Sequence, residues 1–294
     1  MTLKQALNRA KRILAANSIE DASLESELLL RHALGIDRVQ LYTELNHELD
    51  RKQEAIFRNL IKRRLYGEPT AYITGHREFY GLDFYIDSNV LIPRPESELL
   101  VEKALKLAQN HIVPSIAEIG TGCGAIAISL GLNLPQAEIY ATDISASALE
   151  VALFNCQKYR VGNRIHLLHG DMLKPLPEPV DLIVANLPYI KQSELRQMSS
   201  ANFEPLLALN GGSDGLEKIQ QLCCQVSSKL CPRGFLLLEF GQGQGRAVTA
   251  LLRSLFPLAK IEVTPDLGGI DRIVSLTLPH TPQPIGLTLS PASR

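Results

Sequence analysis

The tetrapeptide Asn-Leu-Pro-Tyr at residues 186–189 follows an apolar run typical of a buried strand, and it is the segment that most strongly suggests chemistry. A planar NH₂ group on an amide or aniline-type nitrogen delocalises its lone pair and reacts only when held in a fixed orientation. The side-chain oxygen of Asn186 and the backbone carbonyl of Leu187 or Pro188 can accept its two hydrogens. Tyr189 is expected to wall the pocket. The tetrapeptide alone also fits an ordinary turn after a strand.

A glycine-rich turn is the second candidate site, and we expect it to bind a cofactor. It reads Glu-Ile-Gly-Thr-Gly-Cys-Gly-Ala over residues 118–125, between a predicted strand and a predicted helix. Glycines there allow a tight turn and let a ligand approach the backbone amides at the helix start. The run satisfies the G-x-G-x-x-A dinucleotide pattern, and a purely structural turn is the alternative. Its candidate cofactor-binding residues are Gly120, Thr121, Gly122, Cys123 and Gly124.

The acidic residue Asp143 ends the next predicted strand. An acid at this place normally holds the hydroxyls of a ribose, which nucleotides and S-adenosylmethionine both carry. Its alternative role is to cap the helix that begins near Ser145. The tetrapeptide distinguishes a nucleotide cofactor from S-adenosylmethionine. A hydride-transfer enzyme has no particular use for Asn-x-Pro-Tyr at the carboxyl edge of a sheet. The three motifs together therefore favour a methyltransferase over a nicotinamide-dependent dehydrogenase.

Strands and helices alternate after residue 93, which predicts an α/β doubly wound domain. The run 182–184 is apolar on both faces, as in a sheet covered by helices on two sides. The last two strands have no helix between them, so we expect the final one to be antiparallel. The expected strands are 116–119, 138–142, 164–168, 181–185, 235–240, 261–264 and 272–278, and the expected helices are 96–109, 125–132, 147–159, 215–230 and 245–256.

The first 70 residues indicate a small helical bundle. Helices are expected over residues 2–16, from after Asp21 to Gly35, and after Asp50. The first segment is basic and has no acid before Glu20, as in an organellar presequence. Its apolar residues repeat at helical spacing, however, and further helices follow at once, so we interpret it as the first helix of the bundle.

Aromatic residues on both sides of Gly81 predict a hairpin between this bundle and the α/β domain. The expected organisation is a helical bundle at 1–72 that recognises the substrate protein, a hairpin linker at 73–92, a catalytic domain at 93–279 and a disordered tail at 280–294.

Composition excludes several classes of protein. The formal net charge is −1, which favours neither nucleic acid nor an anionic membrane as a partner. The five cysteines form no C-x-x-C pair, so neither a disulfide framework nor a metal site is expected. No apolar run reaches the length of a membrane span. We therefore expect a cytoplasmic protein, and a monomer.

Several segments resemble the HemK-like release factor glutamine methyltransferases, the PrmC family, over nearly the whole chain. The most specific are the Leu-Ile-Pro-Arg-Pro-Glu run that ends at Glu96 and the Glu-Pro-Leu-Leu-Ala-Leu and Gly-Gly-Ser-Asp-Gly-Leu segments at 204–209 and 211–216. Further matches are 75–84, 118–125, 186–190, 239–244 and 269–273.

The resemblance implies a seven-stranded, Rossmann-like class I methyltransferase domain behind a helical N-terminal domain. It implies S-adenosyl-L-methionine as cofactor, with S-adenosyl-L-homocysteine as product. The acceptor would be the side-chain nitrogen of the glutamine in the Gly-Gly-Gln motif of class I peptide chain release factors, in support of translation termination. Residues 120–124, Asp143 and Asn186 would hold the cofactor, and Met172 would flank its adenine. Residues 186–189 would hold the glutamine.

One position departs from the family, because Leu187 stands where a proline is usual. Asn-Leu-Pro-Tyr also resembles ribosomal RNA adenine-N6 dimethylases, whose acceptor is again a planar NH₂ group. A glutamine of a ribosomal protein is the acceptor of a sister family. These two acceptors and a catalytically idle cofactor-binding module remain the alternatives, and the roles of Arg94, Glu96 and Glu118 are open.

Overall fold

The computed structural model describes residues 1–110, 112–197 and 202–280. The chain forms two compact units, Met1–His76 with Ile86–Ser88, and Arg77–Tyr85 with Asn89–Arg294. Each unit has a hydrophobic core of its own. Beyond His280, the expected tail lies outside the described residues.

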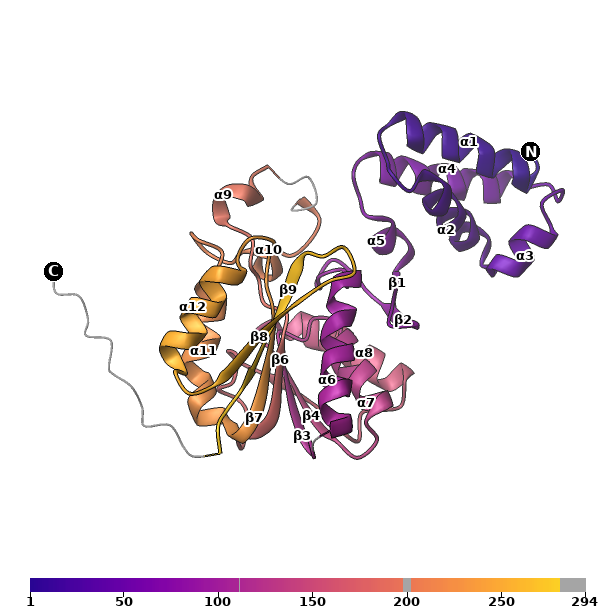
Figure 1. Ribbon diagram of the computed structural model, residues 1–294. Helices are drawn as coiled ribbons and strands as arrows, with labels where there is room; N and C mark the ends of the chain where they lie inside the picture. The colour runs from indigo at the N-terminus through magenta and orange to yellow at the C-terminus, as the bar shows by residue number, and fades with distance from the viewer. Residues whose placement is uncertain (111, 198–201, 281–294) are drawn as a thin grey trace. The chain divides into compact units, whose positions relative to one another are not determined.

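The first unit is a helical bundle (Figure 1). Its helices are α1 (Leu3–Ala16), α2 (Ala22–Leu34), α3 (Arg38–Thr43), α4 (Arg51–Leu65) and α5 (Thr70–Thr74). The three helices predicted from sequence correspond to α1, α2 and α4. The shorter α3 and α5 were not predicted, because six and five residues are too few for a hydrophobic period to show.

Helix α1 shows how the sequence produces this bundle. Leu3, Ala6, Ala10 and Leu14 are buried on one face. The basic residues that resemble a presequence lie on the exposed face of the same helix. Thr2 begins the helix with a capping box, in which its side chain accepts a hydrogen bond from the backbone of Gln5 and the Gln5 side chain accepts one from the backbone of Thr2.

The second unit contains a two-stranded hairpin of β1 (His76–Phe79) and β2 (Leu82–Tyr85). Its turn residues, Tyr80 and Gly81, have φ angles of 51° and 70°, as a two-residue hairpin turn of the primed type requires. Phe79 and Phe84 are both fully buried, with ring centroids 6.3 Å apart. This confirms the hairpin predicted from the aromatic residues.

A seven-stranded sheet forms the centre of this unit, in the order β5-β4-β3-β6-β7-β9-β8. Strands β3 to β7 are parallel, and β9 runs antiparallel to both β7 and β8, as predicted. The strands are β3 (Ser115–Ile119), β4 (Glu138–Asp143), β5 (Ile165–His169), β6 (Val180–Ala185), β7 (Leu230–Glu239), β8 (Lys260–Pro265) and β9 (Asp271–Thr277).

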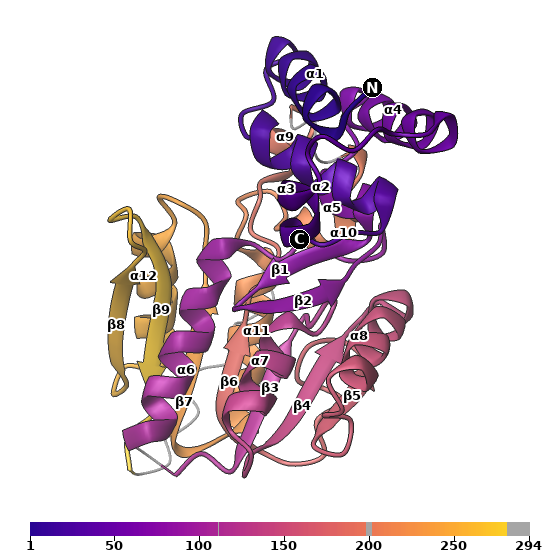
Figure 2. The ribbon, with the colours of Figure 1, turned by 90° about the vertical axis from the view of Figure 1, so that its right-hand side faces the viewer.

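Helices cover both faces of the sheet (Figures 1 and 2). On one face lie α6 (Glu98–Asn110), α7 (Ala125–Asn133) and α8 (Ala146–Lys158), and on the other α11 (Glu217–Lys229) and α12 (Gly245–Leu255). The central residues of β6 and β7 are consequently buried whichever way they point, which explains their unbroken apolar runs. Short helices α9 (Gln192–Leu195) and α10 (Leu206–Leu209) and the 3₁₀ turn η1 (Pro95–Ser97) lie in the connections.

Strand β7 begins at Leu230, earlier than the Phe235 expected from sequence. Pro232 and Gly234 gave this part the composition of a loop. In the structure α11 ends at Lys229 and the chain enters the strand directly, with Leu230 paired to Val180 before the register shifts.

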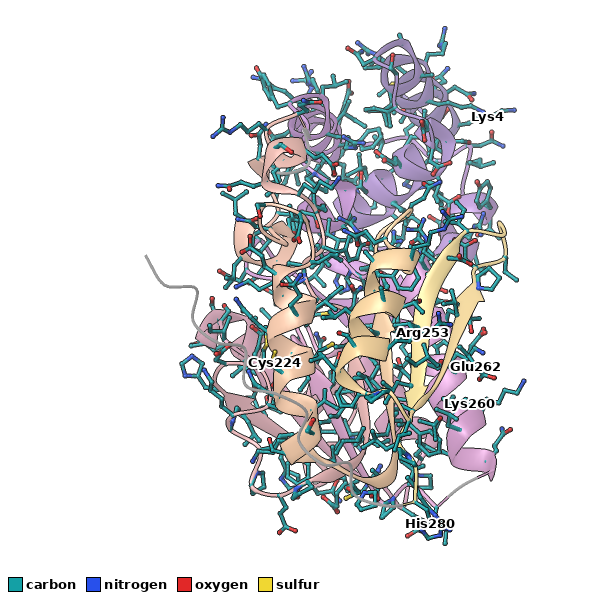
Figure 3. The ribbon with its side chains drawn as sticks, turned by 60° about the vertical axis from the view of Figure 1, so that its left-hand side comes forward. Lys4, Cys224, Arg253, Lys260, Glu262 and His280 are labelled. Atoms are coloured by element: carbon teal, nitrogen blue, oxygen red, sulfur yellow. The ribbon has the colours of Figure 1, made fainter. Side chains whose placement is uncertain are left out.

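Strand β8 forms one edge of the sheet. Figure 3 shows the charged side chains of Lys260 and Glu262 at this edge, where they form an ion pair 2.8 Å long. Charged residues on an edge strand oppose pairing with another chain. Among the described residues, no helix is long and apolar enough to cross a membrane, and no group of three or more His, Cys, Asp or Glu side chains could hold a metal ion.

Candidate active site

A cleft opens at the carboxyl ends of β3, β4 and β6, where an open α/β sheet binds its ligands. Its empty volume is ≈ 870 Å³ with the solvent at its mouth included, within the range of small-molecule sites. It is lined by Asn89, Val90, Leu91, Ile119, Gly120, Gly122, Thr142, Asp143, Ile144, Ser145, Ala148, Gly170, Asp171, Met172, Asn186, Leu187, Pro188, Pro205, Leu207, Ala208 and Lys218.

The glycine-rich turn joins β3 to α7 along one side of this cleft. Gly120 and Gly124 have φ angles of 73° and 83°, which strain any residue with a Cβ. The backbone N–H groups of Gly120 and Thr121 both donate to the carbonyl of Thr142, which fastens the turn to β4. Gly120 and Gly122 line the cleft, whereas Thr121, Cys123 and Gly124 are not among its lining residues.

Asp143 stands at the end of β4 and lines the cleft. One carboxylate oxygen accepts from the backbone N–H of Gly122 and the other from that of Ser145, each at 2.9 Å. Two accepted bonds leave lone pairs on both oxygens for two further donors, such as the hydroxyls of a ribose. The helix α8 is capped by Ser145, whose side chain accepts from Ala148, so Asp143 is not the N-cap.

A buried carboxylate lies beneath the turn. Glu118 is only 2% exposed, and the Thr121 hydroxyl and the Ala127 N–H both donate to its Oε2, at 2.6 and 2.9 Å. Burial raises the pKa of Glu118 to about 8, against the opposing effect of these hydrogen bonds. Glu118 therefore ties the turn to the start of α7 and carries its charge only at alkaline pH. Its role could not be inferred from the sequence.

The tetrapeptide at 186–189 leaves β6 directly into the cleft. The Nδ2 atom of Asn186 donates to the hydroxyl of Ser97 at 2.8 Å. Within the part of the chain that the structure describes, no group donates to Asn186 Oδ1 or to the carbonyls of Leu187 and Pro188. Three acceptors thus remain available where the sequence predicts that an NH₂ group binds.

Two glycines pack closely against the backbone of this tetrapeptide. A Cβ on Gly211 would lie 2.8 Å from the carbonyl oxygen of Pro188, and one on Gly215 would lie 2.5 Å from that of Tyr189. The side chain of Gln244 donates to the same Tyr189 carbonyl at 2.9 Å. These contacts give a physical reason for the Gly-Gly-Ser-Asp-Gly and Gly-Gln-Gly-Gln segments, to which the sequence alone assigns no role.

Tyr189 is the one residue of the tetrapeptide that does not line the cleft. Its hydroxyl donates to Oε1 of Glu239 over 3.5 Å. Burial, with the nearby carboxylate of Glu239, raises the pKa of Tyr189 to about 12, so this residue stays neutral at physiological pH. Oε2 of Glu239 in turn accepts from the Ser97 hydroxyl at 2.6 Å. Neither Ser97 nor Glu239 was singled out by sequence reasoning.

Two candidates remain, Met172 and Arg94, and of these Arg94 does not line the cleft. Met172 lines it, is 7% exposed and has a φ of 54°, an uncommon conformation for a residue other than glycine. Arg94 forms a 2.6 Å ion pair with Glu204, which also accepts from the backbone of Ile92. This pair joins the loop after Leu91 to the segment before α10. Leu91 and Pro205, which lie close to the pair in the sequence, both line the cleft.

Two known protein families match this chain, one over its helical bundle and one over part of its α/β unit. Residues 5–75 match the family described as PrmC N-terminal domain, and residues 95–204 match the Methyltransferase small domain. A methyltransferase structure from Pyrococcus furiosus, 18% identical, covers 75% of this chain and 98% of its own with a TM-score of 0.52, which shows the fold alone.

Sequence relatives identify the family. A release factor glutamine methyltransferase of Moorella thermoacetica is 43% identical over 274 residues, which are 92% of this chain and 97% of the relative. One of Bordetella pertussis is 42% identical over 253 residues, 85% of this chain and 93% of the relative. At this identity and coverage the chain belongs to the release factor glutamine methyltransferases and is an enzyme of that type.

Proposed function

We propose that this enzyme transfers a methyl group from S-adenosylmethionine to the side-chain amide nitrogen of the glutamine in the Gly-Gly-Gln motif of class I peptide chain release factors. The observation that supports this best is the set of free acceptors at Asn186, Leu187 and Pro188 in the cleft. The names of the relatives support the release factor as acceptor. Peptide release takes place in the cytoplasm, and we place the enzyme there.

The cleft fits S-adenosylmethionine. Asp143 has lone pairs for two ribose hydroxyls, and Met172, Ile144 and Ala148 offer apolar surface for an adenine. The cofactor, when bound, supplies an electrophilic methyl group on a sulfonium and leaves as S-adenosylhomocysteine. A cationic donor is favoured by a negative surrounding, and the cleft is lined by two acidic side chains, Asp143 and Asp171, and one basic side chain, Lys218.

The chain's own residues would act chiefly by orientation. Asn186 Oδ1 accepts one hydrogen of the substrate amide, and the carbonyl of Leu187 or Pro188 accepts the other. Both bonds fix the plane of the amide so that one face of its nitrogen looks into the cleft. The two hydrogen bonds donated by the amide also increase the electron density on its nitrogen while the nitrogen forms its new bond to the methyl carbon. The surplus proton on nitrogen leaves after transfer, so no strong base is needed, and neutral Tyr189 supplies none.

A labelling experiment tests the acceptor. The enzyme is incubated with methyl-labelled S-adenosylmethionine and an extract from cells that lack the enzyme, and labelled macromolecules are separated. We expect the label in a class I release factor. Label in a ribosomal protein would indicate the sister activity and label in RNA the adenine-N6 activity, while an absence of label would indicate a binding module. Each of these three results would overturn the proposal.

A further inference from the structure

A chain of three hydrogen bonds runs from the cleft into the protein interior. Asn186 Nδ2 donates to Ser97 Oγ at 2.8 Å, and Ser97 Oγ donates to Glu239 Oε2 at 2.6 Å. Tyr189 donates to the other oxygen of Glu239 over 3.5 Å. Ser97 and Glu239 are 3% and 2% exposed, so solvent does not compete for these bonds. Neither side chain lines the cleft.

The direction of these bonds depends on the charge of Glu239. An ionised carboxylate only accepts hydrogen bonds, so the Ser97 hydroxyl must donate to it and can offer Asn186 only a lone pair. The Asn186 amide then turns its NH₂ toward Ser97, and its oxygen faces the cleft. A protonated Glu239 can donate to Ser97, which frees that hydroxyl to donate to the Asn186 oxygen instead. The amide would then present NH₂ to the cleft, where an acceptor is required.

We propose that Ser97 and ionised Glu239 are positioning residues, which hold the Asn186 amide with its oxygen toward the acceptor nitrogen. This role presupposes the proposed function, in which Asn186 Oδ1 accepts a hydrogen of the substrate amide. Neither residue touches the reacting atoms.

The groups around Glu239 set the pH above which it is ionised and holds the Asn186 amide in this orientation. Burial raises the pKa of Glu239 to about 7. The Ser97 bond lowers it, the carboxylate of Glu96 on η1 raises it, and Arg272 on β9 and the Tyr189 hydroxyl lower it. The ionised form predominates above about pH 7, so Asn186 is correctly oriented on the alkaline side.

Single-turnover methyl transfer to a release factor, at saturating cofactor and acceptor, tests this role between pH 6 and 8.5. We expect the wild-type rate to rise through a midpoint near pH 7 and then level off. Ser97→Ala should be slower by about tenfold at pH 8 and lose the midpoint, because one buried hydrogen bond that orients Asn186 is gone. Ser97→Thr keeps the hydroxyl and should restore both rate and midpoint.

Glu239→Gln is the matched variant for charge. Glutamine offers Ser97 either an oxygen or an NH₂ group, so it no longer selects one direction. Its transfer rate at pH 8 should lie between those of wild type and Ser97→Ala. Its rate should show no midpoint near pH 7. Cofactor affinity should stay within twofold in all three variants. A wild-type midpoint that persists in Glu239→Gln would overturn the proposal, as would a Ser97→Ala rate equal to wild type.

A second measurement needs no acceptor and so separates this inference from the proposed function. The side-chain amide NMR signal of Asn186 in the free enzyme is identified by its loss in Asn186→Ala. It should shift with a midpoint near pH 7 in wild type and remain constant in Glu239→Gln. If the signal titrates but no release factor is methylated, the proposed function fails and the coupling of Glu239 to Asn186 stands. If methylation occurs and the signal does not titrate, the positioning role fails alone.

Discussion

Replacing Asn186 by alanine removes the acceptor to which we assign the first hydrogen of the substrate amide. Oδ1 has no donor among the described residues, so in the free enzyme the change costs little at that atom. In the complex, a substrate N–H would be left unpaired in a closed site, at about 1–3 kcal/mol. Each 1.36 kcal/mol is tenfold in rate, and loss of orientation adds to this, so we expect a fall of about a hundredfold or more.

Asn186→Asp is the matched control. Aspartate keeps an acceptor oxygen in the cleft but cannot donate to Ser97, and it brings a second carboxylate toward Glu239. Its rate should lie between those of alanine and wild type. The assay is single-turnover transfer to a purified release factor at saturating cofactor, with cofactor affinity measured separately. An alanine variant within threefold of wild type would mean that another group holds the amide.

Four further outcomes are expected. Asp143→Ala should weaken S-adenosylmethionine binding by about 1.5–3 kcal/mol in titration calorimetry, because the ribose loses a charged acceptor, whereas NAD should not bind to the wild type; an unchanged dissociation constant would remove Asp143 from the site. Deleting residues 1–70 should spare cofactor binding and slow methylation of the intact release factor, and equal rates would refute a recognition role for the bundle. Leu187→Pro should leave the transfer rate within a few-fold but lower stability, because the Leu187 side chain is 6% exposed and packs in the core; a rate loss as large as that of Asn186→Ala would show that the side chain acts in the site. Because the pKa of Glu118 is raised in the folded state, wild type should lose stability relative to Glu118→Gln as pH rises from about 4.5 to about 8, on the order of a few kcal/mol, and parallel denaturation curves at pH 5 and 8 would contradict this.

The sequence is informative wherever a residue's type is dictated by its own local task. The glycines at 120–124, the acid at the end of β4 and the apolar runs of β6 and β7 each follow from backbone geometry or burial on two sides. The antiparallel last strand follows from a connection too short for a helix. Local physical chemistry is therefore enough to place these features along the chain.

Residues whose role depends on a distant partner cannot be placed in this way. Ser97 and Glu239 are separated by more than a hundred positions and meet only because η1 lies against the end of β7. Arg94 pairs with Glu204, and no local spacing indicates that partner. Both pairs lie within or beside segments that resemble the family. The resemblance indicates that these segments matter, but it does not show which atoms of the four residues interact. Only the fold brings together the atoms that give them a role.

The acceptor atom is the feature on which the whole interpretation depends. The most direct measurement is methyl transfer to a purified class I release factor, followed by tandem mass spectrometry of the peptide that contains Gly-Gly-Gln, with a factor carrying asparagine in place of that glutamine as the matched acceptor. We expect one methyl group on the side-chain nitrogen of the glutamine and none on the asparagine variant, whose amide is one methylene short of the site. Methylation elsewhere on the factor, or equal labelling of both factors, would contradict a site built around Asn186 for that amide.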